Sequence, residues 1–132
     1  MIRFLEYKQN NEVLFTDGLN EFLRSNLMDT ESITSVSYQK YIQDGNPSSS
    51  VLITTKENPE NAQTQNRKEL IFFEFNEHEL GVPEGVDFYK VLNNQLSEIL
   101  NVEDDVLSVE YSRYFYQMKI YTSVLILLNV AL

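Results

Sequence analysis

The chain of 132 residues contains no cysteine, a single histidine, four glycines and only ten basic residues. Without cysteine it has no disulfide, no thiolate metal site and no cysteine nucleophile. His78 alone cannot supply a two-histidine metal site within one chain, and we expect it in a surface loop. The four glycines form no phosphate-binding motif. We therefore expect no enzyme, with no catalytic residue, no metal and no cofactor.

Basic residues are outnumbered by twenty acidic residues, which gives a formal net charge of −10. This balance disfavours direct binding to nucleic acid, because phosphate recognition needs lysine and arginine. Two interpretations of the acidity stay open. It keeps a small protein soluble, or it mimics nucleic acid and occupies a basic groove on a partner, as inhibitors carried by phages and mobile elements do.

No long hydrophobic run is present either. The longest, Val124 to Leu128, is far too short to span a bilayer, and Arg3 and Glu6 interrupt any apolar core of a signal peptide. We therefore expect a cytoplasmic protein that makes no membrane contact. The same run is apolar at every position, which predicts a strand covered on both faces, either by the rest of the chain or by a second molecule.

The chain does contain an internal repeat. Shifted by 73 positions, residues 13–55 match residues 86–128 without a gap. The fourteen identical pairs are Val13/Val86, Phe15/Phe88, Leu19/Leu92, Asn20/Asn93, Leu23/Leu96, Leu27/Leu100, Ser35/Ser108, Val36/Val109, Tyr38/Tyr111, Tyr41/Tyr114, Ser50/Ser123, Val51/Val124, Leu52/Leu125 and Ile53/Ile126. The gapless offset predicts that the two copies superpose about a pseudo-twofold axis.

Each copy has the pattern of a strand, a helix and two more strands. Apolar residues at helical spacing predict one amphipathic helix per copy, beginning near Asn10 or Asn11 in copy one and at Pro83 in copy two. Alternating residues such as Val36 and Tyr38 are typical of half-buried antiparallel strands. The expected strands are Ile2–Tyr7, Ile33–Ile42, Ser50–Lys56, Leu70–Asn76, Val106–Tyr116 and Tyr121–Asn129.

We expect an α+β fold: a tandem duplication of a β-α-β-β unit in a mainly antiparallel sheet with both helices on one face. Both copies belong to a single domain, with residues 1–56 as repeat one, residues 57–68 as a polar linker and residues 69–132 as repeat two. Asp44-Gly45 predicts a tight turn between the last two strands of repeat one. The matching stretch of repeat two, from Gln117 onward, has no such turn signal.

One resemblance is carried by the order of motifs in residues 1–55: Ile-Arg-Phe-Leu-Glu, Gly-Leu-Asn-Glu-Phe-Leu, Ile-Thr-Ser-Val-Ser-Tyr-Gln and Ser-Val-Leu-Ile. This order is similar to a family of very short sporulation-associated proteins of spore-forming bacteria. Repeat two departs from it with Gln95 in place of Phe22 and Ser112 in place of Gln39. The resemblance implies a strand-helix-strand-strand unit and no assigned biochemical activity.

Two features indicate binding. Tyr and Met are enriched at interface cores, and an aromatic-rich segment stands where a polar turn is expected. Its candidate interaction residues are Tyr114, Tyr116, Met118, Ile120 and Tyr121. The alternative is that this hairpin packs inside the monomer.

The second feature is a repeated pair of a basic residue and a tyrosine, Lys40-Tyr41 and Arg113-Tyr114. The pair predicts either a pseudo-symmetric anion or aromatic site or retained cross-strand contacts.

We interpret the chain as a non-enzymatic module that binds a protein or itself as a homo-oligomer, through the hairpin and sheet of repeat two. The alternatives are the acidic nucleic-acid mimic and, third, a small-ligand binder with a pocket between the repeats.

Overall fold

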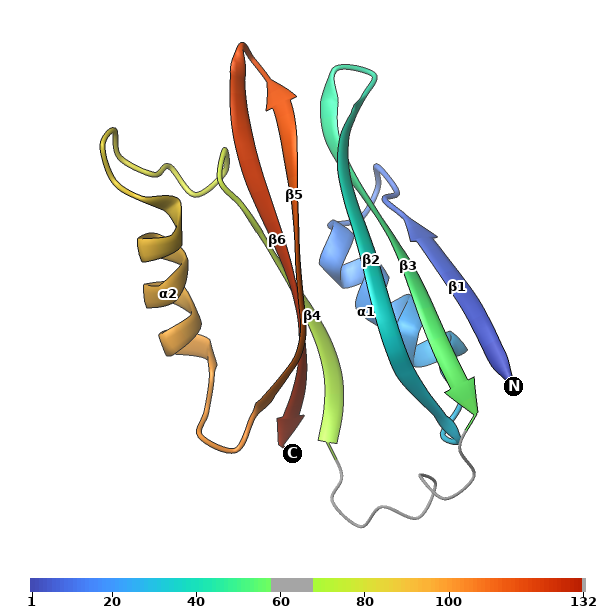
Figure 1. Cartoon of the computed structure of the whole chain (residues 1–132). Helices are drawn as coiled ribbons and strands as arrows, with labels where there is room; N and C mark the ends of the chain where they lie inside the picture. The colour runs from blue at the N-terminus through green and yellow to red at the C-terminus, as the bar shows by residue number, and fades with distance from the viewer. Residues whose placement is uncertain (58–67, 132) are drawn as a thin grey trace.

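The computed structural model describes residues 1–57 and 68–131, which form an α+β fold with the expected duplicated β-α-β-β order (Figure 1). The elements are β1 (Ile2–Lys8), α1 (Phe15–Asn26), β2 (Glu31–Gln43), β3 (Asn46–Glu57), β4 (Lys68–Asn76), α2 (Phe88–Ile99), β5 (Asp105–Tyr116) and β6 (Lys119–Ala131). Nearly all of the expected linker, residues 58–67, lies outside the described residues.

The strands form two antiparallel three-stranded sheets. Sheet 1 has the order β1-β3-β2 and sheet 2 has the order β4-β6-β5. The duplication extends to irregularities: each repeat has a register shift at the same position, between Ile33 and Ser35 and between Val106 and Ser108. Strands β2 and β5 lie close together but belong to different sheets, so the strands form two antiparallel sheets where we expected one mainly antiparallel sheet.

Both helices begin later than the sequence suggested, and the expected starts are wrong. Pro83 precedes Gly85, whose φ of +83° is left-handed and ends any helical path. Helix α2 starts after Asp87, which caps it by accepting a hydrogen bond from the Tyr89 backbone N–H. In repeat one, the Asn10 side chain accepts from the Glu12 N–H in a turn, and α1 starts only at Phe15.

The turns of the two β-hairpins match although their sequences differ. Asp44 and Gly45 have φ values of +52° and +81°, and Gln117 and Met118 have +49° and +67°. Two consecutive left-handed residues are typical of the type I′ hairpin turn, which usually contains asparagine or glycine. Repeat two therefore keeps the same turn, and only the residue types that form it have changed.

Each helix covers the equivalent face of its own sheet, which we call the helix face. Val51 and Ile53 of sheet 1 pack against Leu19 and Leu23 of α1, and Val124 and Ile126 of sheet 2 pack in the same way beneath α2. The opposite face of each sheet is its back face. The back face of sheet 2 carries buried residues as well, namely Phe72, Leu125 and Leu127.

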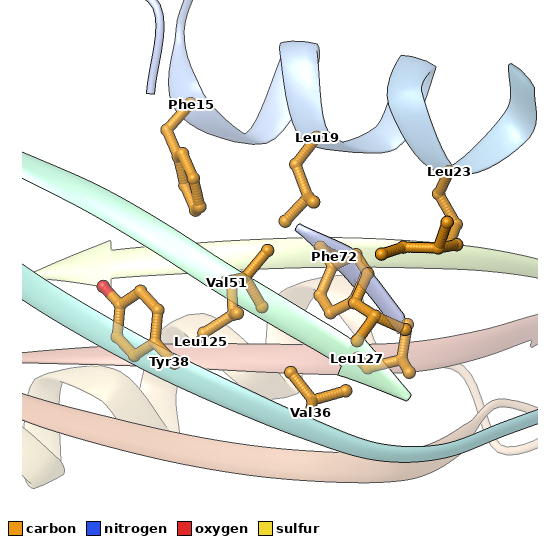
Figure 2. Close-up of a cluster of buried hydrophobic side chains, with 11 residues drawn as sticks. Phe15, Leu19, Leu23, Val36, Tyr38, Val51, Phe72, Leu125 and Leu127 are labelled. Carbon is orange, nitrogen blue, oxygen red and sulfur yellow. The ribbon is translucent and has the colours of Figure 1, made fainter. Parts of the chain in front are cut away.

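The back face of sheet 2 packs into the core of repeat one. Figure 2 shows Phe72 and Leu127 among the side chains of α1, β2 and β3, including Leu19 and Val36. The run from Val124 to Leu128 is therefore buried on both faces, as expected, and the rest of the chain supplies the cover. Because the helix face of one repeat meets the back face of the other, the repeats stack head to tail, and the pseudo-twofold expectation is wrong.

Candidate functional site

The contact between the repeats is anchored by a buried carboxylate. Glu74 projects from the back face of sheet 2, and its Oε2 accepts hydrogen bonds of 2.5 Å from Tyr38 Oη and 2.5 Å from Ser49 Oγ. Lys40 Nζ lies 3.4 Å from Glu74 Oε1, with both side chains buried. Burial and the adjacent Glu74 charge raise the pKa of Tyr38, so its hydroxyl stays a neutral donor. We call these four residues the Glu74 cluster.

The edge of β4 is held by a side-chain clamp from α1. Asn20 Nδ2 donates to the Phe72 carbonyl at 3.1 Å, and the Phe72 backbone N–H donates to Asn20 Oδ1 at 2.7 Å. The clamp satisfies an N–H and a C=O that an edge strand leaves without a partner strand. It also fixes the position of sheet 2 against α1.

The stacking of the repeats places the two pairs, Lys40-Tyr41 and Arg113-Tyr114, in different environments. Lys40 is buried, and its Nζ lies 5.9 Å from the ring centroid of Tyr114, within cation–π range. Arg113 is exposed and Tyr41 half-buried. The structure therefore brings together Lys40 and Tyr114 from different repeats, and it does not form a symmetric site from all four residues.

Part of the candidate hairpin packs within the monomer. His78 makes edge-on contacts with the rings of Tyr114, Tyr116 and Tyr121, and its Nδ1 is hydrogen-bonded to the Tyr114 hydroxyl. Only 17% of the His78 side chain is exposed, and burial lowers its pKa. His78 lies in the turn after β4, as expected for a loop residue, but three tyrosines enclose its ring.

The rest of the hairpin is open. Met118 is 86% exposed in the turn, and Ile120 is 70% exposed. Ile120 pairs across the hairpin with Phe115, which is also exposed. The five candidate interaction residues therefore divide into a packed group of three tyrosines and an exposed pair.

A second exposed apolar surface lies on β5, on the helix face of sheet 2. Val109 and Tyr111 are 57% and 64% exposed, and Val106 and Arg113 are exposed beside them. We call these four residues the β5 surface. Strand alternation places Phe115 on the same side, with its partner Ile120, so the surface continues to the hairpin.

The β5 surface has a covered counterpart in repeat one. At the 73-residue offset Val109 corresponds to Val36 and Tyr111 to Tyr38, which are only 6% and 7% exposed. The back face of sheet 2 covers that counterpart, as Figure 2 shows for Val36 and Tyr38. Sequence reasoning missed the β5 surface because its pattern is the same as that of the buried strand. The signal available was the offset itself, combined with the fact that a stack of two repeats leaves one helix face without a second sheet packed on it.

Two pockets lined by described residues lie where the repeats meet. One of about 210 Å³ is lined by residues that include Lys40 and Glu74, and one of about 260 Å³ lies between Leu27 of repeat one and Leu70 of repeat two. Both are below the usual 300–1,000 Å³ of small-molecule sites. They therefore give little support to a ligand pocket between the repeats.

Comparisons with protein-family models, with curated proteins and with solved structures found no match for the chain. The resemblance of each half to sporulation-associated proteins therefore stays a prediction. Within residues 1–57 and 68–131, no helix is long and apolar enough to cross a membrane. The same residues contain no group of three side chains arranged to hold a metal ion.

Proposed function

We propose that the chain is a non-enzymatic protein-interaction module that docks a protein on the β5 surface. The observation that carries the proposal is the contrast between Val36 and Val109. The same residue at the same position of the repeat is covered by a packed sheet in one case and faces solvent in the other. A surface whose counterpart is a protein contact has the side chains that such a contact needs.

The chemistry of the β5 surface supports this function. Tyrosine and arginine are among the residue types most enriched at interface positions that dominate binding energy, and Tyr111 and Arg113 lie beside two valines. Contiguous apolar surface on a soluble protein commonly marks a contact site. Phe115 and Ile120 extend the surface into the hairpin that the sequence indicated.

Replacement of Val109 by Asp tests the proposal. Val109 is more than half exposed, so Val109→Asp leaves the fold intact while placing a charge in the docking surface. Val102→Asp is a matched control, because Val102 is fully exposed in a turn outside the β5 surface. Circular dichroism verifies that both variants are folded.

The readouts are sedimentation velocity of the purified chain and retention of proteins from its native cells on the immobilised chain. Self-association, or retention of a specific protein, should be lost with Val109→Asp and kept with Val102→Asp. The proposal is wrong if the Val109 variant behaves as the parent chain does in both measurements.

A further inference from the structure

We infer that the occupant of the β5 surface is the back face of sheet 1 from a second copy of this chain, so that copies stack head to tail as the two repeats do. This inference rests on the proposed function and names its partner. The contact between the two repeats within one chain has the geometry that we propose for the contact between two copies. Each surface that forms it has a counterpart elsewhere in the chain, and both counterparts face outward.

Strand register identifies the counterpart of the back face of sheet 2. Leu5 pairs with Ile53 in sheet 1, and Phe73 pairs with Ile126 in sheet 2, at equivalent positions. Phe4 therefore corresponds to Phe72. By the same register, the remaining correspondences are Ile2 with Leu70, Glu6 with Glu74, Leu52 with Leu125 and Thr54 with Leu127.

These counterparts form an exposed apolar patch. Phe4 is 66% exposed, and Ile2 and Leu52 are exposed beside it, whereas Phe72 and Leu125 are buried in the core of repeat one. The back face of sheet 1 thus carries aromatic and aliphatic side chains that nothing in the described part of the chain covers. Its composition resembles that of the back face of sheet 2, which packs against the helix face of sheet 1.

The polar partners of the Glu74 cluster are duplicated across the two free surfaces. Tyr38, Lys40 and Ser49 correspond to Tyr111, Arg113 and Thr122 on the helix face of sheet 2. Their carboxylate corresponds to Glu6 on the back face of sheet 1. Two hydroxyls and a cation are therefore matched with a carboxylate a second time.

Within one chain these groups cannot meet. The β5 surface and the back face of sheet 1 face opposite sides of the stack, and Figure 1 shows α2 and sheet 1 at opposite sides of the molecule. Among the described residues Glu6 forms an ion pair with Lys8 at 3.8 Å, and both side chains are exposed, so this ion pair is weak. A second copy would place its Glu6, on the apolar back face of its sheet 1, against Tyr111, Arg113 and Thr122 of the first copy.

The asparagine that forms the α1 clamp is also duplicated. Asn93 of α2 is identical to Asn20, lies at the equivalent helical position and is exposed. Its counterpart target is the backbone of Phe4, because β1 is the edge strand of sheet 1 as β4 is of sheet 2. Tyr41 on the approaching copy would face Arg113 as Tyr114 faces Lys40.

The resulting contact uses a different surface on each copy, so it is heterologous. Such contacts produce linear assemblies of copies that grow until a ring closes or a filament forms. Association should therefore continue beyond a dimer as the concentration rises.

Charge reversal tests the inference. Glu6 and Arg113 are both exposed, so Glu6→Arg and Arg113→Glu should leave the monomer folded. Each single variant should raise the dissociation constant for self-association by about tenfold or more, because it places like charges together in the contact. The double variant Glu6→Arg/Arg113→Glu should recover self-association, since the two surfaces are complementary again. Phe4→Ser gives an independent loss of apolar contact, and Met118→Ser is a control outside both surfaces.

Sedimentation velocity across a concentration series separates the outcomes. Growth of the parent chain beyond a dimer, loss in both single variants and recovery in the double variant support the inference. A parent chain that stays monomeric overturns it, yet the proposed function stands if another protein binds in a manner that depends on Val109. Self-association that ignores both charge reversals, or that Met118→Ser abolishes, overturns the head-to-tail contact and assigns self-association to another surface.

Discussion

Val36 and Val109 occupy the same position in the two repeats, but Val36 is 6% exposed and Val109 is 57% exposed. Their local structures match: both lie on a strand with the same register shift, facing the helix of their repeat. The difference arises because sheet 2 packs on Val36 while nothing in the described part of the chain packs on Val109. Position within the stack thus decides whether the same side chain acts in stability or is available for binding.

The first prediction follows from this contrast. Val36→Ala should lower the free energy of unfolding by about 1–3 kcal/mol, because buried methyl groups are lost. Val109→Ala should change it by no more than about 0.5 kcal/mol, as is usual for surface positions. Urea denaturation of the monomer at low concentration measures both. Equal losses at the two positions would contradict the stacked arrangement.

Leu23 and Leu96 provide a second matched pair. Leu23 is buried against sheet 1 and the back face of sheet 2, and Leu23→Ala should cost about 2–5 kcal/mol. Leu96 is only partly buried at the open side of α2, so Leu96→Ala should cost less than Leu23→Ala. Denaturant midpoints of the two variants give the order, and a larger loss at Leu96 would show that α2 packs more deeply than described.

The Glu74 cluster predicts that the free energy of unfolding depends strongly on its cation, Lys40. Lys40→Met should cost about 3–5 kcal/mol, because it leaves the Glu74 carboxylate buried without its ion-pair partner. Arg113→Met, at the equivalent position of repeat two, should leave the stability of the monomer nearly unchanged because Arg113 is exposed. Adding Glu74→Gln to Lys40→Met should recover part of the loss. Thermal melts of Lys40→Met, Glu74→Gln and the double variant show whether the two substitutions are coupled, and additive losses would argue against the ion pair.

Acid should destabilise repeat one through Glu31. Arg3 donates to this buried carboxylate from Nε at 3.0 Å and from Nη2 at 2.5 Å, and Thr55 donates at 2.6 Å. These hydrogen bonds, Arg3 first, lower the pKa of Glu31 from 4.5 to about 2.

Because the folded pKa of Glu31 lies below its unfolded value, the stabilisation is complete above pH 4.5 and is lost as the pH falls toward 2. Glu31→Gln should lower the stability at neutral pH and flatten its decline in acid. Urea melts across this pH window measure the effect. Parallel pH profiles for the variant and the parent chain would contradict it.

Local pattern predicted the elements well because each repeat satisfies the same local rules twice. The spacing of Leu19, Leu23 and their counterparts predicts both helices, and alternation predicts the strands. The helix starts were missed because Gly85 adopts a left-handed conformation and Asp87, which lies closer to the apolar stripe, caps α2 instead.

The site was harder to predict because it depends on how the repeats are placed. Tyr114, which was a candidate interaction residue, is buried because His78 and Lys40 lie against it. Tyr111 is exposed, although it is identical to buried Tyr38. No local pattern distinguishes such counterparts, since the distinction arises only when sheet 2 packs on repeat one. Likewise Glu31 and Glu74, which count toward the acidic composition, are buried in ion pairs.

Mixing two disabled variants tests the central claim most directly. Phe4→Asp disables the back face of sheet 1 and Val109→Asp disables the β5 surface, and each retains the surface that the other lacks. Separately, both should sediment as monomers of 15.4 kDa, and an equimolar mixture should form a 1:1 complex of twice that mass and nothing larger. A mixture that stays monomeric while the parent chain associates, or a variant that dimerises on its own, would contradict head-to-tail stacking.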